Sequence, residues 1–259
     1  MNRHEIELPS VASTQRTNET IMKTRLLSIS IVVLALLATS CSSGSMEADA
    51  QIEESFTRVV ITVGSGDVTV QQTTGPSEWF ASASFSGDKP PFEPKVIEGV
   101  LIVSDGCDPS SDCSALYTIN VPKSSEVTAS SGSGDITIVG IEAPVDVHTD
   151  SGTVFLNTVL GEIHVHTNSG NIVGTRLEAS SATFIATSGN IDVSFENVIA
   201  NLTVETDTGN VTAQLAEGPY NLNTDADSGS TDIKINDDDT APNMVSLSTG
   251  SGDLTVYRQ

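Results

Sequence analysis

Short runs in which every second residue is apolar recur along most of the chain. Val145 and Val147 flank Asp146, and the same alternation returns at residues 163–165. A period of two is typical of β-strands that bury one side and expose the other. Because each run covers only a few residues, the sequence predicts many short strands.

A short phrase separates these runs and occurs eight times: Ser or Thr, then Gly, then a small residue, Asp or Asn. From Gly134 onward its glycines are 18, 18, 19, 20, 20 and 23 residues apart. A near-constant period of this length is typical of a solenoid, in which each unit buries its apolar side by stacking on its neighbours. Glycine also permits the positive φ that a corner between two strands requires. The eight glycines are Gly66, Gly134, Gly152, Gly170, Gly189, Gly209, Gly229 and Gly252.

The repeat also predicts which side chains point inward. We predict an all-β fold, a parallel β-helix or β-solenoid with rungs of about 18–20 residues, in which aliphatic side chains stack in columns. The alternative is an antiparallel meander or sandwich with hairpin turns at SGN and SGD. Columns of one residue type at near-constant spacing favour the solenoid. The predicted inward residues are Val68, Val70, Ile136, Ile138, Val145, Val147, Val154, Leu156, Ile163, Val165, Ile191, Val193, Leu202, Val204, Val245, Leu247, Leu254 and Val256.

Residues 55–121 are less regular than the rest of the chain. They carry one copy of the glycine phrase, the only tryptophan (Trp79) and the Pro-rich sequence GDKPPFEP. We interpret them as irregular, strand-rich turns that lead into the solenoid and cap its first edge, because open sheet edges invite pairing with other chains. Residues 122–259 then form the regular repeats, with no obvious cap at the far end beyond Tyr257 and Arg258.

The segment from Met22 to Cys41 has the features of a bacterial export signal. Lys23 and Arg25 precede an apolar run of 13 residues, which is too short to span a bilayer comfortably and is typical of a signal peptide. The small residues ATS before the cysteine resemble a lipobox, with Ala in the place of the usual Leu. We therefore interpret residues 22–40 as a lipoprotein signal peptide and Cys41 as the lipidated first residue. An ordinary secretory signal is the alternative.

The segments on either side of this signal are polar. A signal peptide normally begins a chain, so we interpret residues 1–21 as a gene-model extension and Met22 as the true start. Residues 41–54 are small, polar and acidic. They predict a flexible tether between the membrane and the fold.

Two further cysteines, Cys107 and Cys113, stand in the sequence CDPSSDC. In an oxidising compartment such a pair closes a small disulfide loop. A zinc knuckle is the alternative, but two thiolates without a nearby His or Cys make a poor zinc site. The spacing therefore favours a disulfide that holds one surface loop.

Charge excludes several functions. The chain has 34 acidic and 11 basic residues and a formal charge of −23. Nucleic acids and anionic lipids are bound through clustered Lys and Arg, so neither is an expected ligand.

No Ser-His-Asp order or Cys-His pair stands out, and we expect no catalysis. Sugar platforms stack on aromatic rings, yet the regular repeats offer only Phe155 and Phe184 as outward candidates.

Histidine forms the sharpest candidate site. His148 and His166 are 18 residues apart, each four residues before a repeat glycine, so they are expected on adjacent rungs. His164 lies on the same side of its strand, with Asp146 as its expected neighbour. Three imidazoles and a carboxylate predict a zinc, copper or nickel site. The competing interpretation is that exposed strand positions simply carry polar residues.

Two other polar patterns are weaker candidates. The segment from Asp225 to Asp239 holds six aspartates, which suggests surface calcium, although it matches neither the EF-hand nor the calcium β-roll repeat. An Asp or Asn follows most repeat glycines. We interpret this row as structural, because Asx side chains hydrogen-bond the backbone of neighbouring turns.

The lipobox, the sequence INVP before the regular repeats and the recurring SGDI and SGNI phrases together resemble a bacterial β-strand-repeat, adhesin-like family of unknown function. The resemblance extends from about Phe56 to the C-terminus and implies a right-handed β-helix, as in the head domains of adhesins. The family has no established catalytic residues, so none is transferred to this chain.

These observations predict a non-enzymatic, adhesin-like lipoprotein of the cell envelope that presents a β-solenoid as a binding surface. Its expected partners are the membrane, through the lipid anchor, and an envelope protein or glycan. Ser42 after the lipidated cysteine is not an inner-membrane retention Asp, which favours the outer membrane in a Gram-negative source. The alternatives are an envelope-stress sensor that acts through a protein partner and a structural spacer.

Overall fold

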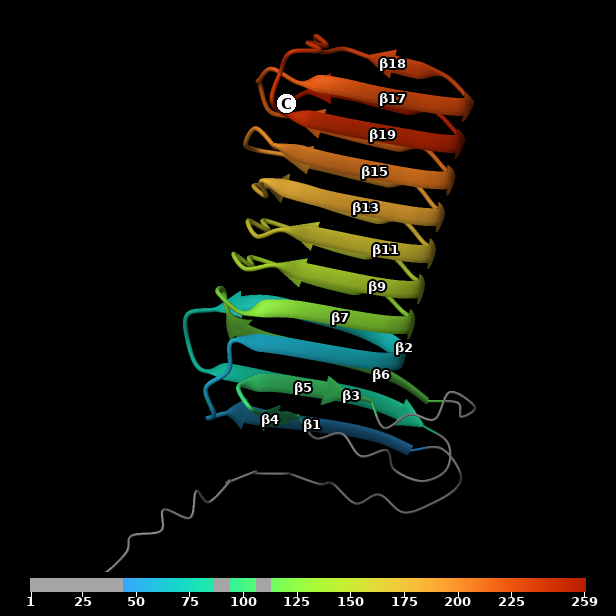
Figure 1. Ribbon diagram of the computed structural model, residues 1–259. Helices are drawn as coiled ribbons and strands as arrows, with labels where there is room; N and C mark the ends of the chain where they lie inside the picture. Colours follow the sequence, from blue (N-terminus) through green and yellow to red (C-terminus); the bar gives the residue numbers. More distant parts are fainter. Residues whose placement is uncertain (1–43, 86–93, 106–112) are drawn as a thin grey trace, which may run out of the picture. The chain divides into compact units, whose positions relative to one another are not determined.

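The regular repeats build a stack of parallel strands (Figure 1). The computed structural model describes residues 44–85, 94–105 and 113–259, all of which belong to one compact unit. In this described part every regular element is a β-strand, and no helix is long and apolar enough to cross a membrane. The strands are β1 Gly44–Ile52, β2 Arg58–Thr73, β3 Ser77–Phe85, β4 Lys95–Ile97, β5 Val100–Ser104, β6 Cys113–Pro122, β7 Glu126–Ser133, β8 Ile136–Val139, β9 Val145–Ser151, β10 Val154–Asn157, β11 Ile163–Ser169, β12 Ile172–Leu177, β13 Ser181–Ser188, β14 Ile191–Phe195, β15 Asn201–Thr208, β16 Val211–Leu215, β17 Asn221–Ser228, β18 Thr231–Ile233, β19 Met244–Ser251 and β20 Leu254–Arg258.

Each regular rung consists of two strands joined at a glycine. In one rung β9 ends at Ser151, Gly152 has a φ of 134°, and β10 begins at Val154. The longer strand pairs in parallel with the longer strands of the neighbouring rungs, as β11 does with β9 and β13. The shorter strand pairs with the shorter strands, as β10 does with β8 and β12. The stack therefore has two parallel sheets, here called the first sheet, which contains β9, and the second sheet, which contains β10.

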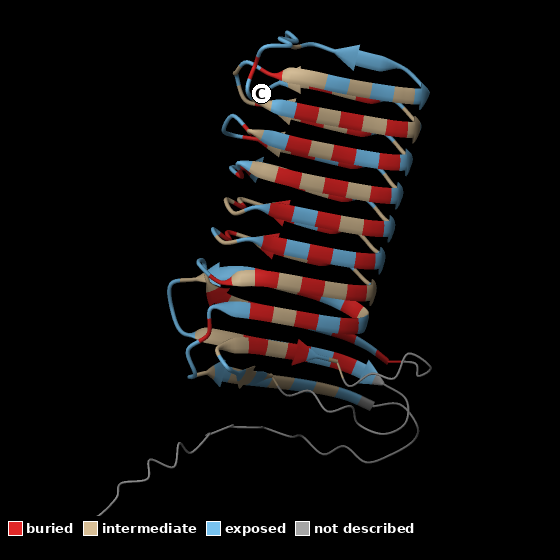
Figure 2. Cartoon of the chain, in the orientation of Figure 1, coloured by how far each residue is buried: buried red, intermediate tan, exposed pale blue. Residues whose placement is uncertain are grey.

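The aliphatic residues between these sheets form the core (Figure 2). Val145, Ile163, Ala182, Leu202 and Val245 are register partners in successive strands of the first sheet, and each is at most 2% exposed. All eighteen residues predicted from the sequence to point inward are buried. Stacking thus removes apolar surface from water on every rung. Each Å² of apolar surface buried contributes about 25 cal/mol to stability. The predicted parallel β-solenoid is confirmed.

One predicted outward aromatic residue is part of this core. Phe184 is fully buried, whereas Phe155 remains 39% exposed. The alternation of β13 places Phe184 inward together with Ala182 and Ala186. Two small neighbours leave the volume that a phenyl ring fills, so the expectation that Phe184 points outward is wrong.

The order of rungs in space differs from the order in sequence at both ends. β19 pairs with β15 on one side and with β17 on the other. The last rung of the sequence therefore lies between the two rungs that precede it in sequence. At the other end β2 pairs with β5 and β6 and also with β7 and β8. After β2 the chain therefore forms β3 to β6 at the end of the stack, and it then returns to form β7 and β8 on the other side of β2. The C-terminal strand β20 pairs with β18, so β20 is not the last strand of the second sheet in space.

The segment predicted to be a flexible tether contains a strand. β1 pairs antiparallel with β3 from Gly44 to Ile52. Alternate residues Met46, Ala48, Ala50 and Ile52 pack against the core. This period of two was missed because small and acidic residues make up most of the segment. Residues 44–52 form a strand at the edge of the second sheet.

Candidate functional site

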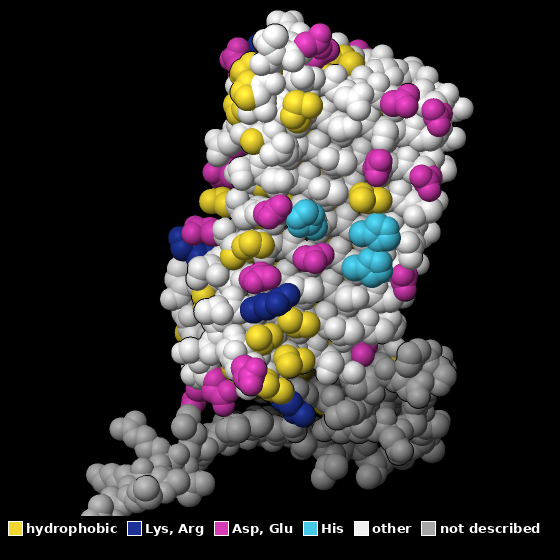
Figure 3. Space-filling view, in the orientation of Figure 1, with side chains coloured by type: hydrophobic (Ala, Val, Ile, Leu, Met, Phe, Trp, Pro, Cys, Tyr) yellow, Lys and Arg dark blue, Asp and Glu magenta, His cyan; other side chains and the backbone are white. Residues whose placement is uncertain are grey.

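The outer face of the first sheet carries rows of polar side chains. Register pairing aligns Ser130, His148, His166, Ile185 and Glu205 in one such row across five strands, and Ile185 is its single apolar member. Histidine side chains gather near the middle of this face, with acidic side chains around them (Figure 3). Because each strand is held by parallel neighbours on both sides, the backbone positions from which these side chains extend are fixed in the sheet.

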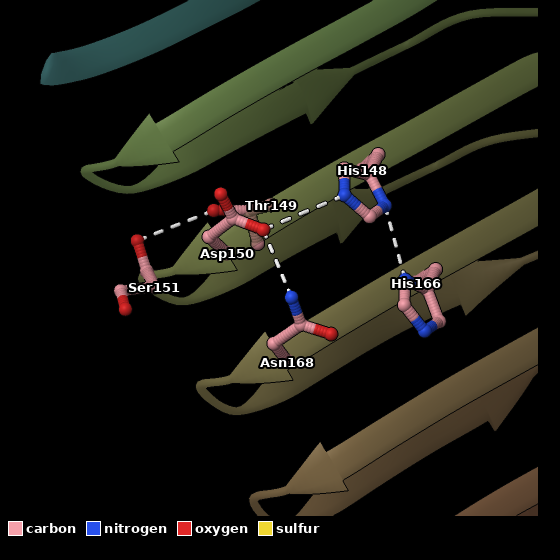
Figure 4. Close-up of polar contacts among 6 residues, drawn as sticks. All are labelled: His148, Thr149, Asp150, Ser151, His166 and Asn168. Atoms are coloured by element: carbon pink, nitrogen blue, oxygen red, sulfur yellow. Dashed lines mark hydrogen bonds and ion pairs between the residues drawn. The ribbon is translucent and has the colours of Figure 1, made fainter. Parts of the chain in front are cut away.

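The predicted neighbours His148 and His166 are in direct contact (Figure 4). Their Nδ1 atoms are 3.0 Å apart and their ring planes are inclined by only 9°. The ring centres are 4.9 Å apart, so the two Nδ1 edges point toward each other. One Nδ1 must carry a proton and the other a lone pair for this hydrogen bond to form.

Asp150 and Asn168 continue the same contact network toward the end of the strands (Figure 4). Asn168 Nδ2 donates to Asp150 Oδ1 over 2.9 Å. The same oxygen lies 3.7 Å from His148 Nε2. The carboxylate is therefore held beside the ring nitrogen that does not face His166.

The remaining members of the predicted metal set are placed differently. His164 is the register partner of Asp146, as predicted, but its Nε2 lies 3.2 Å from Glu162 Oε1. No three His, Cys, Asp or Glu side chains form a group able to hold a metal ion in the described part of the chain. The structure thus brings His148 and His166 together and leaves His164 in a separate contact with Glu162.

A hollow of about 300 Å³ lies farther along the same face, toward the C-terminal rungs. Ser248 and Gly250 of β19 line it, between Glu205 and Asp207 of β15 and two aspartates of β17, Asp225 and Asp227. Ser248 and Gly250 on the middle strand are smaller than the acidic residues on both flanking strands. We call this feature the acidic hollow.

Sequence reasoning missed the acidic hollow because β19 inserts between β15 and β17. Glu205 and Asp225 are 20 residues apart, like neighbours on adjacent rungs, but both are register partners of Ser248. The only warning in the sequence is the longer spacing of 23 residues between the last two repeat glycines.

The six aspartates proposed as a calcium segment are dispersed. Asp225 and Asp227 line the acidic hollow, and Asp232 forms an ion pair with Lys234 at 2.7 Å. Asp237 accepts a hydrogen bond from the backbone N–H of Leu222 at 2.9 Å. Several of these carboxylates therefore stabilise the last rung in space instead of converging on one point.

Asp238 stabilises the loop that follows. Its Oδ1 accepts hydrogen bonds from both the backbone N–H and the hydroxyl of Thr240, which lower the pKa of this carboxyl group. The carboxylate thus closes a local turn.

The Asx row after the repeat glycines connects one rung to the next, as the sequence predicts. Asn190 accepts a hydrogen bond from the backbone N–H of Asn210 at 2.8 Å, and its own N–H donates to Asn171 Oδ1 at 2.9 Å. Asp253 accepts from both the backbone and the hydroxyl of Ser230, which lowers its pKa. These side chains therefore hydrogen-bond the turns at the corners of the solenoid.

A half-buried acidic group lies near the start of the stack. Asp105 accepts hydrogen bonds from the backbone N–H groups of Gly64 and Ser65, at 2.5 and 3.4 Å. Burial raises the pKa of Asp105 above its usual value, and the two N–H groups oppose that shift. Burial, with the charge of Asp105, also raises the pKa of Tyr117.

Of the three cysteines in the predicted sites, the structure describes only Cys113. Cys41 and Cys107 lie outside the described residues. Cys113 is the first residue of β6 and is 6% exposed. The lipidation and the pairing of Cys107 with Cys113 stay predictions.

Fold and site together define an all-β protein built as a parallel β-solenoid, with a polar outer face on its first sheet. Residues 13–257 match the family model described as Toastrack DUF4097. The chain therefore belongs to the Toastrack DUF4097 family. Among curated proteins, none matches this chain.

Three solved structures show partial similarity to this chain. A "putative adhesin" from Bacteroides fragilis is 16% identical, with 83% of this chain and 97% of that chain covered and a TM-score of 0.49. A "putative adhesin" from Parabacteroides merdae is 14% identical, with 83% and 96% covered and a TM-score of 0.46. A "putative cell adhesion protein" from Clostridium sporogenes is 12% identical, with 83% and 100% covered and a TM-score of 0.40. The assignment of the fold rests on the strand pairing of this chain.

Proposed function

We propose that this protein is a non-enzymatic, lipid-anchored lipoprotein of the cell envelope that binds a partner through the outer face of its first sheet. The observation that carries the proposal is the acidic hollow, in which four carboxylates surround small residues on a rigid strand ladder. Like charges on neighbouring positions of one face are unfavourable. A cationic group of a partner relieves this repulsion.

The chemistry of the face favours an envelope protein or an amine-bearing glycan as the partner. Glu205, Asp207, Asp225 and Asp227 offer charge-assisted hydrogen bonds to ammonium and guanidinium groups. The net charge of −23 steers cationic partners toward the protein and keeps anionic ones away. Aromatic stacking platforms for neutral sugars are absent from the rows described on this face.

The export signal and Cys41 support the anchored location. Lipid attachment at that residue tethers the module to a membrane while the acidic solenoid remains in the aqueous compartment. In a Gram-negative source Ser42 favours the outer membrane. This location also fits a sensor that acts through a protein partner, the second candidate function.

A crosslinked pull-down from bacterial envelopes tests the binding face. Asp207→Asn/Asp227→Asn removes two charges from the acidic hollow. Asp192→Asn/Glu196→Gln, at exposed positions in and just after β14 of the second sheet, is the matched control. We expect wild type and control to retain the same protein or glycan and the hollow variant to lose it.

The outcomes separate the candidate functions. Enrichment of a glycan supports adhesion, whereas one stoichiometric protein supports the sensor. Equal recovery by all three proteins contradicts a role for the acidic hollow. If none of them retains any component, the protein is a spacer and the proposal is wrong.

A further inference from the structure

His148 and His166 stand side by side on a backbone that allows them little movement. Their residues are register partners in the β9–β11 ladder, which is paired from Ile163 to Thr167. The residues that alternate with them, Val147 and Val165, are buried in the core. We propose that these two imidazoles chelate a divalent transition metal ion, Cu(II) above all, on the outer face of the first sheet.

The distance between the two nitrogens suits a chelate. At a metal–nitrogen distance of about 2.0–2.1 Å, two Nδ1 atoms 3.0 Å apart subtend an angle of about 95° at the metal. Angles near a right angle are found between neighbouring ligands in tetragonal Cu(II) and Ni(II) sites, whereas tetrahedral Zn(II) requires a wider angle. Small rotations about the broad χ2 torsions turn both lone pairs toward one point.

Binding requires a lone pair on both Nδ1 atoms. The proton that now lies in the Nδ1–Nδ1 hydrogen bond must therefore move to the Nε2 atom of the same ring. For His148 that atom faces Asp150 Oδ1 at 3.7 Å. Metal-bound histidines commonly donate their second N–H to a carboxylate, which orients the ring.

Asn168 supports this second contact. Its amide donates to Asp150 Oδ1 over 2.9 Å and so holds the carboxylate beside His148. Of the six residues labelled in Figure 4, His148 and His166 are the two ligands, and Asp150 and Asn168 are two positioning residues. Water completes the coordination, because the pair is exposed on the surface.

The donor set selects the metal. Imidazole nitrogen suits copper, nickel and zinc, and affinity for a given site follows the order Ni(II) < Cu(II) > Zn(II). Calcium and magnesium prefer oxygen ligands. His164 is left out of the site because its Nε2 is turned toward Glu162.

Cu(II) titration of the full chain, followed by calorimetry and electron paramagnetic resonance, tests the proposal. We expect one strong site with coupling to two nitrogens. His148→Ala and His166→Ala should each lower the affinity for Cu(II) at least about tenfold, and Asp150→Asn about tenfold. His164→Ala is the control, with a change within about twofold.

Several results would overturn the chelate. They are the absence of binding by wild type, coupling to a single nitrogen, or an equal loss of affinity in His164→Ala. Circular dichroism of each variant shows whether the solenoid is intact, and His148→Gln replaces His148→Ala if that variant does not fold. Full affinity in a folded variant that lacks either His148 or His166 also contradicts the proposal.

Discussion

At the scale of single residues, the corner glycines permit the rungs to stack closely. Gly152 has a φ of 134°, and a Cβ atom built on it would collide with the backbone carbonyl of Gly134 on the preceding rung. Gly189 and Gly209 stand in the same relation to the rung before each of them. A side chain at these positions therefore meets both an unfavourable backbone conformation and a neighbouring backbone that cannot move aside.

We predict that Gly152→Ala lowers the free energy of unfolding by about 3 kcal/mol or more. Gly99→Ala is the control, because Gly99 has a φ of 78° but no atom within 4 Å of the added Cβ. That variant should lose only the cost of the left-handed conformation, about 1–2 kcal/mol. Urea denaturation measures both, and equal losses would show that close stacking is not the cause.

The Asx row gives a second prediction at this scale. Asn190→Ala removes the acceptor for the backbone N–H of Asn210 and should lower the free energy of unfolding by about 1–2 kcal/mol. Asn190→Asp retains an oxygen at this position, as Asp135 does for Thr153, and should restore most of the stability. If the Asp variant is as unstable as the Ala variant, the hydrogen bond to Asn210 is not the source.

At the scale of elements, the strands at the end of the stack differ from those inside it. β13 is paired on both sides, and its inward residues are buried. β17 pairs only with β19 among the named strands, and Leu222, Thr224 and Ala226 on its inward side are only partly buried. Asp237 covers one amide of this edge by accepting from the N–H of Leu222. Acidic residues along an edge also oppose pairing with other chains.

Hydrogen exchange should therefore be uneven along the stack. We expect amides of β17 and β18 to exchange about a hundredfold faster than those of β13, because edge strands open at a small fraction of the global free energy. Mass spectrometry of peptides from 221–233 and 181–188 measures the difference. Uniform protection of both segments would mean that the stack opens as one unit.

The same elements show how much the sequence could predict. The columns that contain Val145 and Ile163 followed from a period of two inside a period of nearly nineteen residues, because each rung repeats the environment of the one before. The contact between His148 and His166 followed from the same spacing. Wherever rungs follow one another in order, positions relative to the repeat glycine determine neighbours in space.

The ends of the stack could not be predicted in this way. The insertion of β19 between β15 and β17 breaks the rule that adjacent repeats are adjacent rungs, and so the acidic hollow was not foreseen. Local size decided the place of Phe184, since Ala182 and Ala186 leave volume for it. In β1 two of the four alternating residues are alanines, whose burial contributes too little to mark a strand in an acidic segment.

At the scale of the whole molecule, stacked rungs give a protein whose stability is distributed along one axis. Each rung contacts its neighbours, so contributions from successive rungs are close to additive. The surface is acidic, with a formal charge of −23, which keeps the protein soluble and sets it apart from anionic membranes. A module of this kind needs a separate anchor to stay at a membrane surface, and Cys41 provides the candidate.

Intact mass and detergent partition of the protein expressed in a bacterial host test directly whether it is an anchored envelope module. We expect a mature chain that starts at Cys41, carries diacyl or triacyl groups and enters the detergent phase. Cys41→Ser should move the protein to the aqueous phase. An unlipidated, soluble wild-type product that is cut at another residue would contradict the anchor and indicate a secreted binding protein.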